Sequence, residues 1–157
     1  MESIIPPIRN TARALIRRDN NILLLRKNGY ADGDRFALPG GGQDPGETLE
    51  QALSRECLEE IGTRVGIRTL VYVADCFKPR HTEPPGMRHL VEFLFECTVP
   101  DDYVPKNGHH PDKHQVDVVW ARLDKLVGMP LYPRSLAPYL TDSRQGTGTV
   151  YLGVLDW

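Results

Sequence analysis

The stretch from Leu38 to Thr63 reads Leu-Pro-Gly-Gly-Gly-Gln-Asp-Pro-Gly-Glu-Thr-Leu-Glu-Gln-Ala-Leu-Ser-Arg-Glu-Cys-Leu-Glu-Glu-Ile-Gly-Thr. Within it, Asp44-Pro45-Gly46-Glu47 is typical of a turn, because proline presets φ and glycine can adopt a positive φ. Thr48, with Gln51 three residues later, has the pattern of a capping box at a helix N-terminus. The stretch therefore predicts a glycine loop that leads directly into a helix from Leu49 to Ile61.

This helix carries carboxylates on the side to which its apolar residues point. At about 100° per residue, Glu56 and Glu60 continue the apolar stripe that begins at Leu49, and Glu59 lies at its margin. Like charges three and four residues apart repel one another, and burial adds to the cost. A hard divalent cation such as Mg²⁺ or Mn²⁺ prefers oxygen ligands and would neutralise them. We therefore expect Glu56, Glu59 and Glu60 to bind a metal, with Arg55 orienting one carboxylate; the alternative is a solvated acidic face.

The glycine loop before the helix suggests a second, anionic ligand. Gly40, Gly41 and Gly42 leave successive backbone N–H groups uncovered, and such an arrangement can bind phosphate oxygens. Arg26 and Lys27 end a predicted strand close to this loop and can also bind a diphosphate. The alternative for these two cations is a solvated strand end.

From Gly41 the chain reads Gly, five residues, Glu47, seven residues and then Arg-Glu-Cys-Leu-Glu-Glu-Ile-Gly-Thr over residues 55–63, which resembles the signature box of the Nudix hydrolases. Cys57 and Thr63 depart from the usual aliphatic residues, and both are small enough to pack. The resemblance implies an α/β/α sandwich on a mixed β-sheet. It also implies hydrolysis of a diphosphate linkage in a nucleoside diphosphate derivative.

The same resemblance implies roles for the charged residues of the box. Metal ions held by Glu56, Glu59 and Glu60 would polarise phosphoryl oxygens and activate a water molecule. Glu59 is our choice of general base, Glu56 belongs to the catalytic set, and Arg55 is assigned to orientation and charge balance. Glu47 is expected to fix the loop against the helix.

Other segments leave the general base and the substrate open. In many Nudix enzymes a catalytic Glu stands shortly before a Trp like Trp120, and here His114 lies near that place. Pro79, at the sixteenth position after the box, resembles the ADP-ribose-cleaving branch, while nucleoside triphosphates or dinucleotides fit equally well. The aromatic residues considered for stacking on a base, each of which is more often part of a core, are Tyr30, Phe36 and Phe77.

Two other classes of function agree less well with the sequence. A nucleotide-binding sensor of the same fold would be expected to lose carboxylates of the box, and all of them are present. An isomerase acting on a prenyl diphosphate would need a nucleophilic cysteine in the cleft, but Cys57 lies within the box helix and Cys76 has no recognisable context. Hydrolysis is therefore the favoured function.

Length and composition limit the remaining possibilities. The 157 residues suit a single Nudix domain over 1–157, and 19 Lys plus Arg against 21 Asp plus Glu give a net charge of −2, without a basic field for polynucleotides. Three cysteines without Cys-x-x-Cys spacing suit a reducing cytoplasm. Residues 1–10 lack the apolar core of a signal peptide, and no run is long enough to span a membrane. We expect a cytoplasmic monomer or homodimer that acts on a small nucleotide.

The rest of the chain reads mainly as strands. The predicted strands are Thr11–Arg17, Asn21–Arg26, Phe36–Leu38, Ile67–Ala74, His89–Thr98, Gln115–Arg122 and Gly148–Leu155. The predicted loops are Asn28–Asp34, Phe77–Met87 and Asp101–His114, and two short helices are predicted at Leu123–Val127 and Ser135–Leu140. This pattern agrees with the α/β class.

Two groups of polar residues stay ambiguous at this level. Alternation over His89–Thr98 places Glu92 and Glu96 on the face opposite the presumed core, where either is a candidate metal ligand or base or simply part of a solvent face. His109, His110 and His114 lie close together but lack the spacing of a metal site, so a flexible loop is the favoured interpretation.

Overall fold

A computed structural model describes residues 7–141 and 148–157 of the chain. Residues 1–10 are expected to form no signal peptide, and the first six of them lie outside the described part. Within the described part, no helix is both long and apolar enough to cross a membrane.

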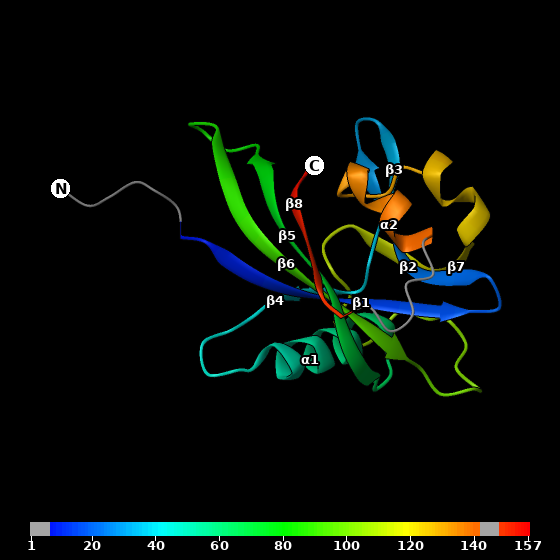
Figure 1. Ribbon diagram of the computed structural model, residues 1–157. Helices are drawn as coiled ribbons and strands as arrows, with labels where there is room; N and C mark the ends of the chain where they lie inside the picture. The colour runs from blue at the N-terminus through cyan, green and yellow to red at the C-terminus, as the bar shows by residue number, and fades with distance from the viewer. Residues whose placement is uncertain (1–6, 142–147) are drawn as a thin grey trace.

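A mixed eight-stranded sheet dominates the described residues, with the strand order β3-β2-β1-β6-β5-β8 (Figure 1). The strands are β1 (Arg9–Arg18), β2 (Asn21–Tyr30), β3 (Gly33–Ala37), β4 (Gly40–Gly42), β5 (Gly66–Arg80), β6 (Gly86–Thr98), β7 (Gln115–Arg122) and β8 (Val150–Leu155). The parallel pairs are β1 with β6 and β5 with β8, and the other pairs are antiparallel. Two strands lie off the main order, since β4 pairs with β1 and β7 pairs with β2.

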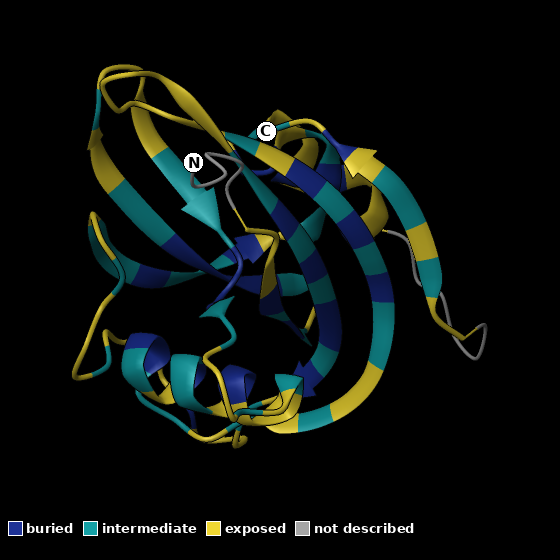
Figure 2. Ribbon diagram, turned by 90° about the vertical axis from the view of Figure 1, so that its left-hand side faces the viewer, coloured by how far each residue is buried: buried dark blue, intermediate teal, exposed yellow. Residues whose placement is uncertain are grey.

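Helices cover both faces of this sheet, which confirms the predicted α/β/α arrangement (Figures 1 and 2). On one face, α1 (Leu49–Ile61) packs Leu53 and Ile61 into one core cluster. On the other face lie the 3₁₀ segments η1 (Leu123–Gly128) and η2 (Arg134–Leu136) with α2 (Ala137–Thr141), and these contribute to a second cluster. The central strands therefore bury side chains on both sides.

The helix α1 begins and ends where the sequence predicts. The Thr48 hydroxyl accepts a hydrogen bond from the backbone N–H of Gln51, and the Gln51 side chain accepts one from the backbone N–H of Thr48. Gly62 follows the helix with φ of 71°, a left-handed conformation that favours glycine. The capping box and the C-terminal glycine thus fix the register of the carboxylates on the helix.

Two predicted loops are largely strand. Within 28–34, β2 continues to Tyr30 and β3 begins at Gly33, with these two residues paired across the turn. Within 77–87, β5 runs to Arg80 and β6 starts at Gly86, so only 81–85 connect them. The glycines and prolines there suggest loops, but long-range pairing with the neighbouring strand decides the conformation. The 101–114 segment is irregular, as predicted.

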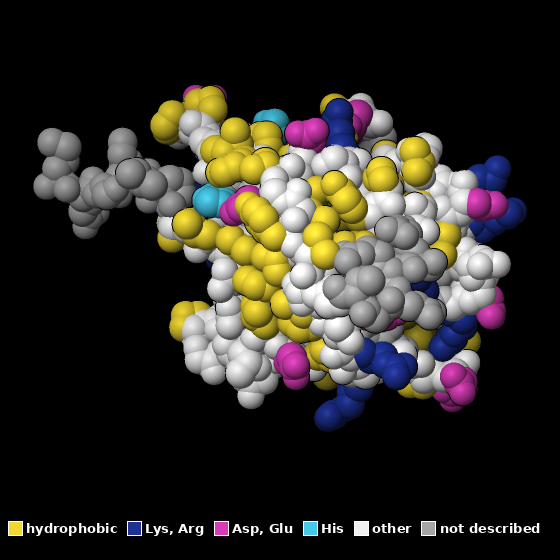
Figure 3. All heavy atoms as spheres, in the orientation of Figure 1, with side chains coloured by type: hydrophobic (Ala, Val, Ile, Leu, Met, Phe, Trp, Pro, Cys, Tyr) yellow, Lys and Arg dark blue, Asp and Glu magenta, His cyan; other side chains and the backbone are white. Residues whose placement is uncertain are grey.

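Apolar side chains gather on the surface over β5, β6 and β8 (Figure 3). The large exposed ones on these strands are Phe77, Met87, Tyr151 and Val154. Nothing in the structure shows what covers this surface, and the expectation of a monomer or homodimer stays a prediction.

Candidate active site

The box carboxylate that lies deepest is Glu60, which is 2% exposed. Its Oε1 accepts a hydrogen bond of 2.7 Å from the backbone N–H of Gly40. Burial raises the pKa of Glu60 to about 8, against the smaller opposing effect of that hydrogen bond. Among the described residues, no Lys or Arg forms an ion pair with it. The inward direction predicted for this residue is therefore confirmed.

Arg55 joins the loop to the other box carboxylates. Its guanidinium donates to Glu47 at 2.7 and 2.9 Å and to the carbonyl of Gly42 at 3.0 Å. It also donates to Glu56 at 3.0 Å and lies 3.6 Å from a carboxylate oxygen of Glu59. One arginine thus orients three acids and the loop at once.

The acids around Arg55 differ in how firmly they hold their charge. The hydrogen bond from Arg55, helped by the backbone N–H of Asp44, lowers the pKa of Glu47 to about 2. Burial instead raises the pKa of Glu56, although Arg55 opposes this shift. Glu47 therefore serves as the fixed counter-charge that holds Arg55 in place, which agrees with its expected role.

Within the described part of the chain, no three His, Cys, Asp or Glu side chains are grouped closely enough to hold a metal ion. The donor chemistry nevertheless suits a hard divalent cation, since Glu60 is a buried carboxylate without a cationic partner and Glu56 lies beside it on the helix face. Glu59 is the more exposed neighbour, with a quarter of its side chain accessible. The assignment of these three residues as ligands stays a prediction.

The sequence predicts that the three glycines bind phosphate through their backbone N–H groups. They form β4, which pairs with β1, and the N–H of Gly40 is already bonded to Glu60. A Cβ on Gly40 would lie 2.0 Å from the carbonyl oxygen of Ala12, and one on Gly41 would lie 2.6 Å from the carboxylate of Glu56. These glycines permit close approach of the strand to β1 and of Glu56 to the loop, and binding of phosphate by the loop stays untested.

The two cations expected to bind a diphosphate have different surroundings. Arg26 is paired with Asp117 at 2.8 Å and with Asp34 at 3.1 Å, so its charge is already compensated. Lys27 pairs with Asp112 at 2.5 Å and lines a cavity next to the box helix. Of the two, Lys27 is the one in a position to reach a ligand in that cavity.

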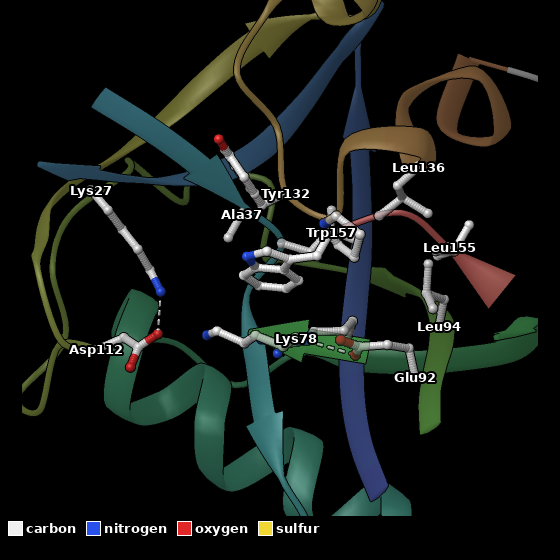
Figure 4. Close-up of a pocket in the computed structure, with 13 residues that line it drawn as sticks. Lys27, Ala37, Lys78, Glu92, Leu94, Asp112, Tyr132, Leu136, Leu155 and Trp157 are labelled. Atoms are coloured by element: carbon white, nitrogen blue, oxygen red, sulfur yellow. Dashed lines mark hydrogen bonds and ion pairs between the residues drawn. The ribbon is translucent and has the colours of Figure 1, made fainter. Parts of the chain in front are cut away.

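This cavity has about 540 Å³ of empty space, including its open mouth (Figure 4). Its charged lining residues are Arg13, Lys27, Lys78, Glu92 and Asp112, and its apolar and aromatic ones include Leu94, Tyr132, Leu136, Leu155 and Trp157. The cavity borders the box through Gly40, whose N–H binds Glu60 while its carbonyl accepts a hydrogen bond of 2.9 Å from Arg13. One glycine residue therefore separates the box carboxylates from the cavity wall.

Glu92 lies in this wall, and the interpretation of its face as solvent-exposed is wrong. The residue is 2% exposed because η2 and α2 cover the face that bears it, where Leu94 is also buried. Glu92 Oε2 accepts hydrogen bonds from the hydroxyl of Thr11 and from Arg13 Nε, the latter at 3.1 Å. Glu96, by contrast, keeps 47% of its side chain exposed and lies 3.9 Å from Arg17.

Among the described residues, no histidine of the 101–114 segment forms an ion pair with a box carboxylate. His114 is exposed and packs on Tyr30 with ring centroids 4.9 Å apart. The backbone N–H groups of Gly108 and His110 bond the carbonyls of Glu60 and Glu59 at 3.0 Å each. The segment therefore caps the C-terminal end of α1, and nothing in the structure assigns His114 the part of a base.

The aromatic residues at the cavity are not the ones the sequence suggested. Phe36 packs in the core, and Tyr30 and Phe77 contact histidines away from the cavity lining. Tyr132 reaches the cavity because backbone bonds of 2.9 Å tie residues 130 and 132 to Phe36. Trp157 reaches it because β8 pairs in parallel with β5. Sequence spacing carries no signal for either, since both placements depend on strand pairing.

Comparison with known proteins adds a family and several relatives. The profile described as "NUDIX domain" matches residues 7–141. The "NAD-capped RNA hydrolase NudC" of Edwardsiella ictaluri (strain 93-146) is 33% identical over 115 residues, which cover 73% of this chain and 39% of that protein. The "ADP-ribose pyrophosphatase" of Methanocaldococcus jannaschii is 35% identical over 81 residues, covering 52% of this chain and 45% of that protein. The chain thus spans less than half the length of these relatives.

Among solved structures, an ADP-ribose pyrophosphatase from Streptococcus suis 89-1591 is similar with a TM-score of 0.64 at 21% identity, covering 91% of this chain and 98% of that one. At this identity the similarity shows the fold, and it agrees with the mixed sheet and few helices described above.

Proposed function

The chain belongs to the Nudix family, and on that premise we propose that it is a divalent-metal-dependent hydrolase that cleaves the diphosphate linkage of a nucleoside diphosphate derivative. The family match covers strands β1 to β7, the box helix and the loop that Arg55 holds. Its relatives include an ADP-ribose pyrophosphatase and an NAD-capped RNA hydrolase, and these names support the reaction class.

The observation that carries the proposal is the buried carboxylate of Glu60. A carboxylate that is 2% exposed and has no cationic side chain as ion-pair partner is costly in a stable fold. Its position on Gly40, next to a cavity lined by aromatic and basic side chains, supports a site for an anionic ligand that brings a divalent cation with it. Because burial raises the pKa of this carboxyl, its ionised form needs a cation beside it.

The charged side chains of the site then have different roles. Arg55 holds Glu56 and Glu59 in place and is itself held by Glu47. Glu59 has the longest contact with Arg55 among these acids and is partly exposed, so it is the freest to accept a proton from an attacking water. Lys27 and Arg13, both at the cavity, can offset phosphate charge.

Glu56, Glu59 and Glu60 would hold the metal. When bound, Mg²⁺ or Mn²⁺ would polarise the phosphoryl oxygens and lower the pKa of a water molecule.

The test is turnover of a substrate panel with and without metal. The panel comprises nucleoside triphosphates, ADP-ribose, dinucleoside polyphosphates, NADH and, because relatives bear that name, an NAD-capped RNA. We expect cleavage of at least one member, with nucleoside monophosphate among the products, loss of turnover in chelator and recovery with Mg²⁺ or Mn²⁺. Full turnover in chelator, or no cleavage of any member with metal, would refute the proposal.

The alternative of a sensor that binds nucleotides without cleaving them gives a different result. It would bind panel members in equilibrium measurements and release no product, so the same panel separates the two functions.

A further inference from the structure

One atom in the cavity wall has no partner. Glu92 Oε1 is fully buried, and within the described residues it is the one buried side-chain polar atom without a hydrogen bond. An unpaired buried acceptor is costly, and native structures rarely retain one without a reason. The carboxylate is nevertheless held firmly, because its other oxygen accepts hydrogen bonds from Thr11 and Arg13.

The strand register explains why the hydrogen bonds of this carboxylate all go to one oxygen. Glu92 on β6 pairs with Thr11 on β1, and Arg13 follows two residues later on the same face. Both neighbours donate to Oε2, so Oε1 of this cavity-lining carboxylate is left without a donor (Figure 4). The acceptor is therefore preorganised for a donor that the protein does not supply.

The rest of the cavity suits a flat, partly apolar group. The rings of Trp157 and Tyr132 lie 5.6 Å apart, and Lys78 Nζ lies 4.4 Å from the centroid of the Trp157 ring (Figure 4). Leu94, Leu136 and Leu155 add apolar lining. Aromatic and aliphatic walls with a few fixed polar atoms are typical of sites that bind a heterocyclic ring.

We propose that Glu92 Oε1 accepts a hydrogen bond from the exocyclic amino group of the substrate's base, and that Glu92 thereby selects amino bases over their keto counterparts. The inference rests on the proposed function, because it places the nucleoside of that substrate in this cavity. A carboxylate oxygen attracts the N–H of an adenine or cytosine amino group and repels the carbonyl oxygen of hypoxanthine or uracil. A site that hydrogen-bonds one group discriminates strongly against an analogue that lacks it.

Glu92→Gln gives a specific test of this selection. The partners of Oε2 are both donors, a hydroxyl and a guanidinium N–H, so the glutamine carbonyl must take that position. Its amide NH₂ then faces the cavity in place of Oε1. The variant changes the cavity acceptor into a donor at nearly constant volume, and its preference should turn toward keto bases.

The experiment measures dissociation constants of AMP against IMP and of CMP against UMP by calorimetry, together with kcat/KM for matched triphosphates. We expect the parent to prefer the amino member of the pair that it binds by at least ~10-fold, and Glu92→Gln to abolish or reverse that preference. Glu96→Gln, on the same strand but largely exposed, is the matched control and should keep the parental ratio.

Other outcomes overturn the inference. Equal affinity of the parent for both members of every pair, or a preference for the keto member, contradicts base selection by Glu92. If Glu92 has a purely structural role, Glu92→Gln should weaken the binding of both members of a pair equally. If Glu92 binds metal, the variant should also need a higher Mg²⁺ concentration for its half-maximal rate. Because the binding arm needs no turnover, failure of the inference is distinguishable from failure of the proposed hydrolysis.

Discussion

Glu60 and Glu92 are both acidic side chains with 2% exposure, but their partners differ. Glu60 comes from a helix that ends in clustered acids, and its direct partner is the backbone N–H of Gly40. Glu92 comes from a central strand and has the cation Arg13 and a hydroxyl as partners. The first site lacks a cation, while the second lacks only a donor for one oxygen. We infer that the two regions serve different parts of one ligand, a metal-bound diphosphate and a base.

We expect the largest effect on activity from a substitution of Glu59 on the box helix. Glu59→Gln removes a charge at nearly constant volume, so kcat should fall by at least ~10²-fold, the scale of general-base loss. The metal-free variant should melt no lower than the metal-free parent, because repulsion among neighbouring acids is relieved. Turnover and melting are measured on the same preparation.

Glu50→Gln on the exposed first turn of the same helix is the control and should keep parental turnover. A Glu59→Gln variant with parental kcat would remove Glu59 from the reaction.

We expect a smaller loss of activity when a side chain is added at Gly41, in the loop before the box helix. In Gly41→Val the new Cβ would lie 2.6 Å from the carboxylate of Glu56, so that carboxylate must move. We expect kcat/KM to fall by roughly 10-fold, because misplaced charged groups lose transition-state contacts. Steady-state kinetics measure this, with Gly86→Val as the control, since a Cβ there would meet nothing within 4 Å. Unchanged kinetics would show that the contact with Gly41 is dispensable.

Burial of Glu60 should make the stability of the metal-free protein depend on pH. Glu60 has an ordinary pKa of 4.5 and a folded-state pKa of about 8, so between these values the folded state binds more protons than the unfolded state. Stability in chelator should therefore fall as pH rises through this window, by on the order of 10 °C in Tm across the whole window.

The variant Glu60→Gln keeps an acceptor for Gly40 and should lose this slope, which thermal melts at several pH values will reveal. Saturating Mg²⁺ should also flatten the slope in the parent. A parental slope that persists in Glu60→Gln would assign it to other groups.

The smallest effect is expected at Glu96, on the same face of β6 as Glu92 but towards the end of the strand. Glu96 is 47% exposed and 3.9 Å from Arg17, so Glu96→Gln should change the free energy of unfolding by less than about 0.5 kcal/mol. Denaturant titration measures it. A loss of several kcal/mol would show that the contrast between Glu92 and Glu96 does not follow from burial.

The sequence by itself determined the box helix and the sign of its charges. Turn residues, a capping box and a terminal glycine act within a few residues of one another, so Thr48, Gln51 and Gly62 fix the helix ends without help from the fold. The inward direction of Glu60 follows from the same helical period. Alternation likewise identified the strand that carries Glu92, although not which of its faces is covered.

Only the tertiary structure decided which groups lie next to those charged side chains. Strand pairing brings Arg13, Lys78, Glu92 and Trp157 to one cavity from distant parts of the chain, and it turns the glycine loop into a strand whose Gly40 N–H is bonded to Glu60. Side-chain contacts of this kind depend on register and on which elements cover a sheet face, and no local pattern encodes them. Helix geometry is set by neighbours in sequence, whereas the partners of a buried charge are set by neighbours in space.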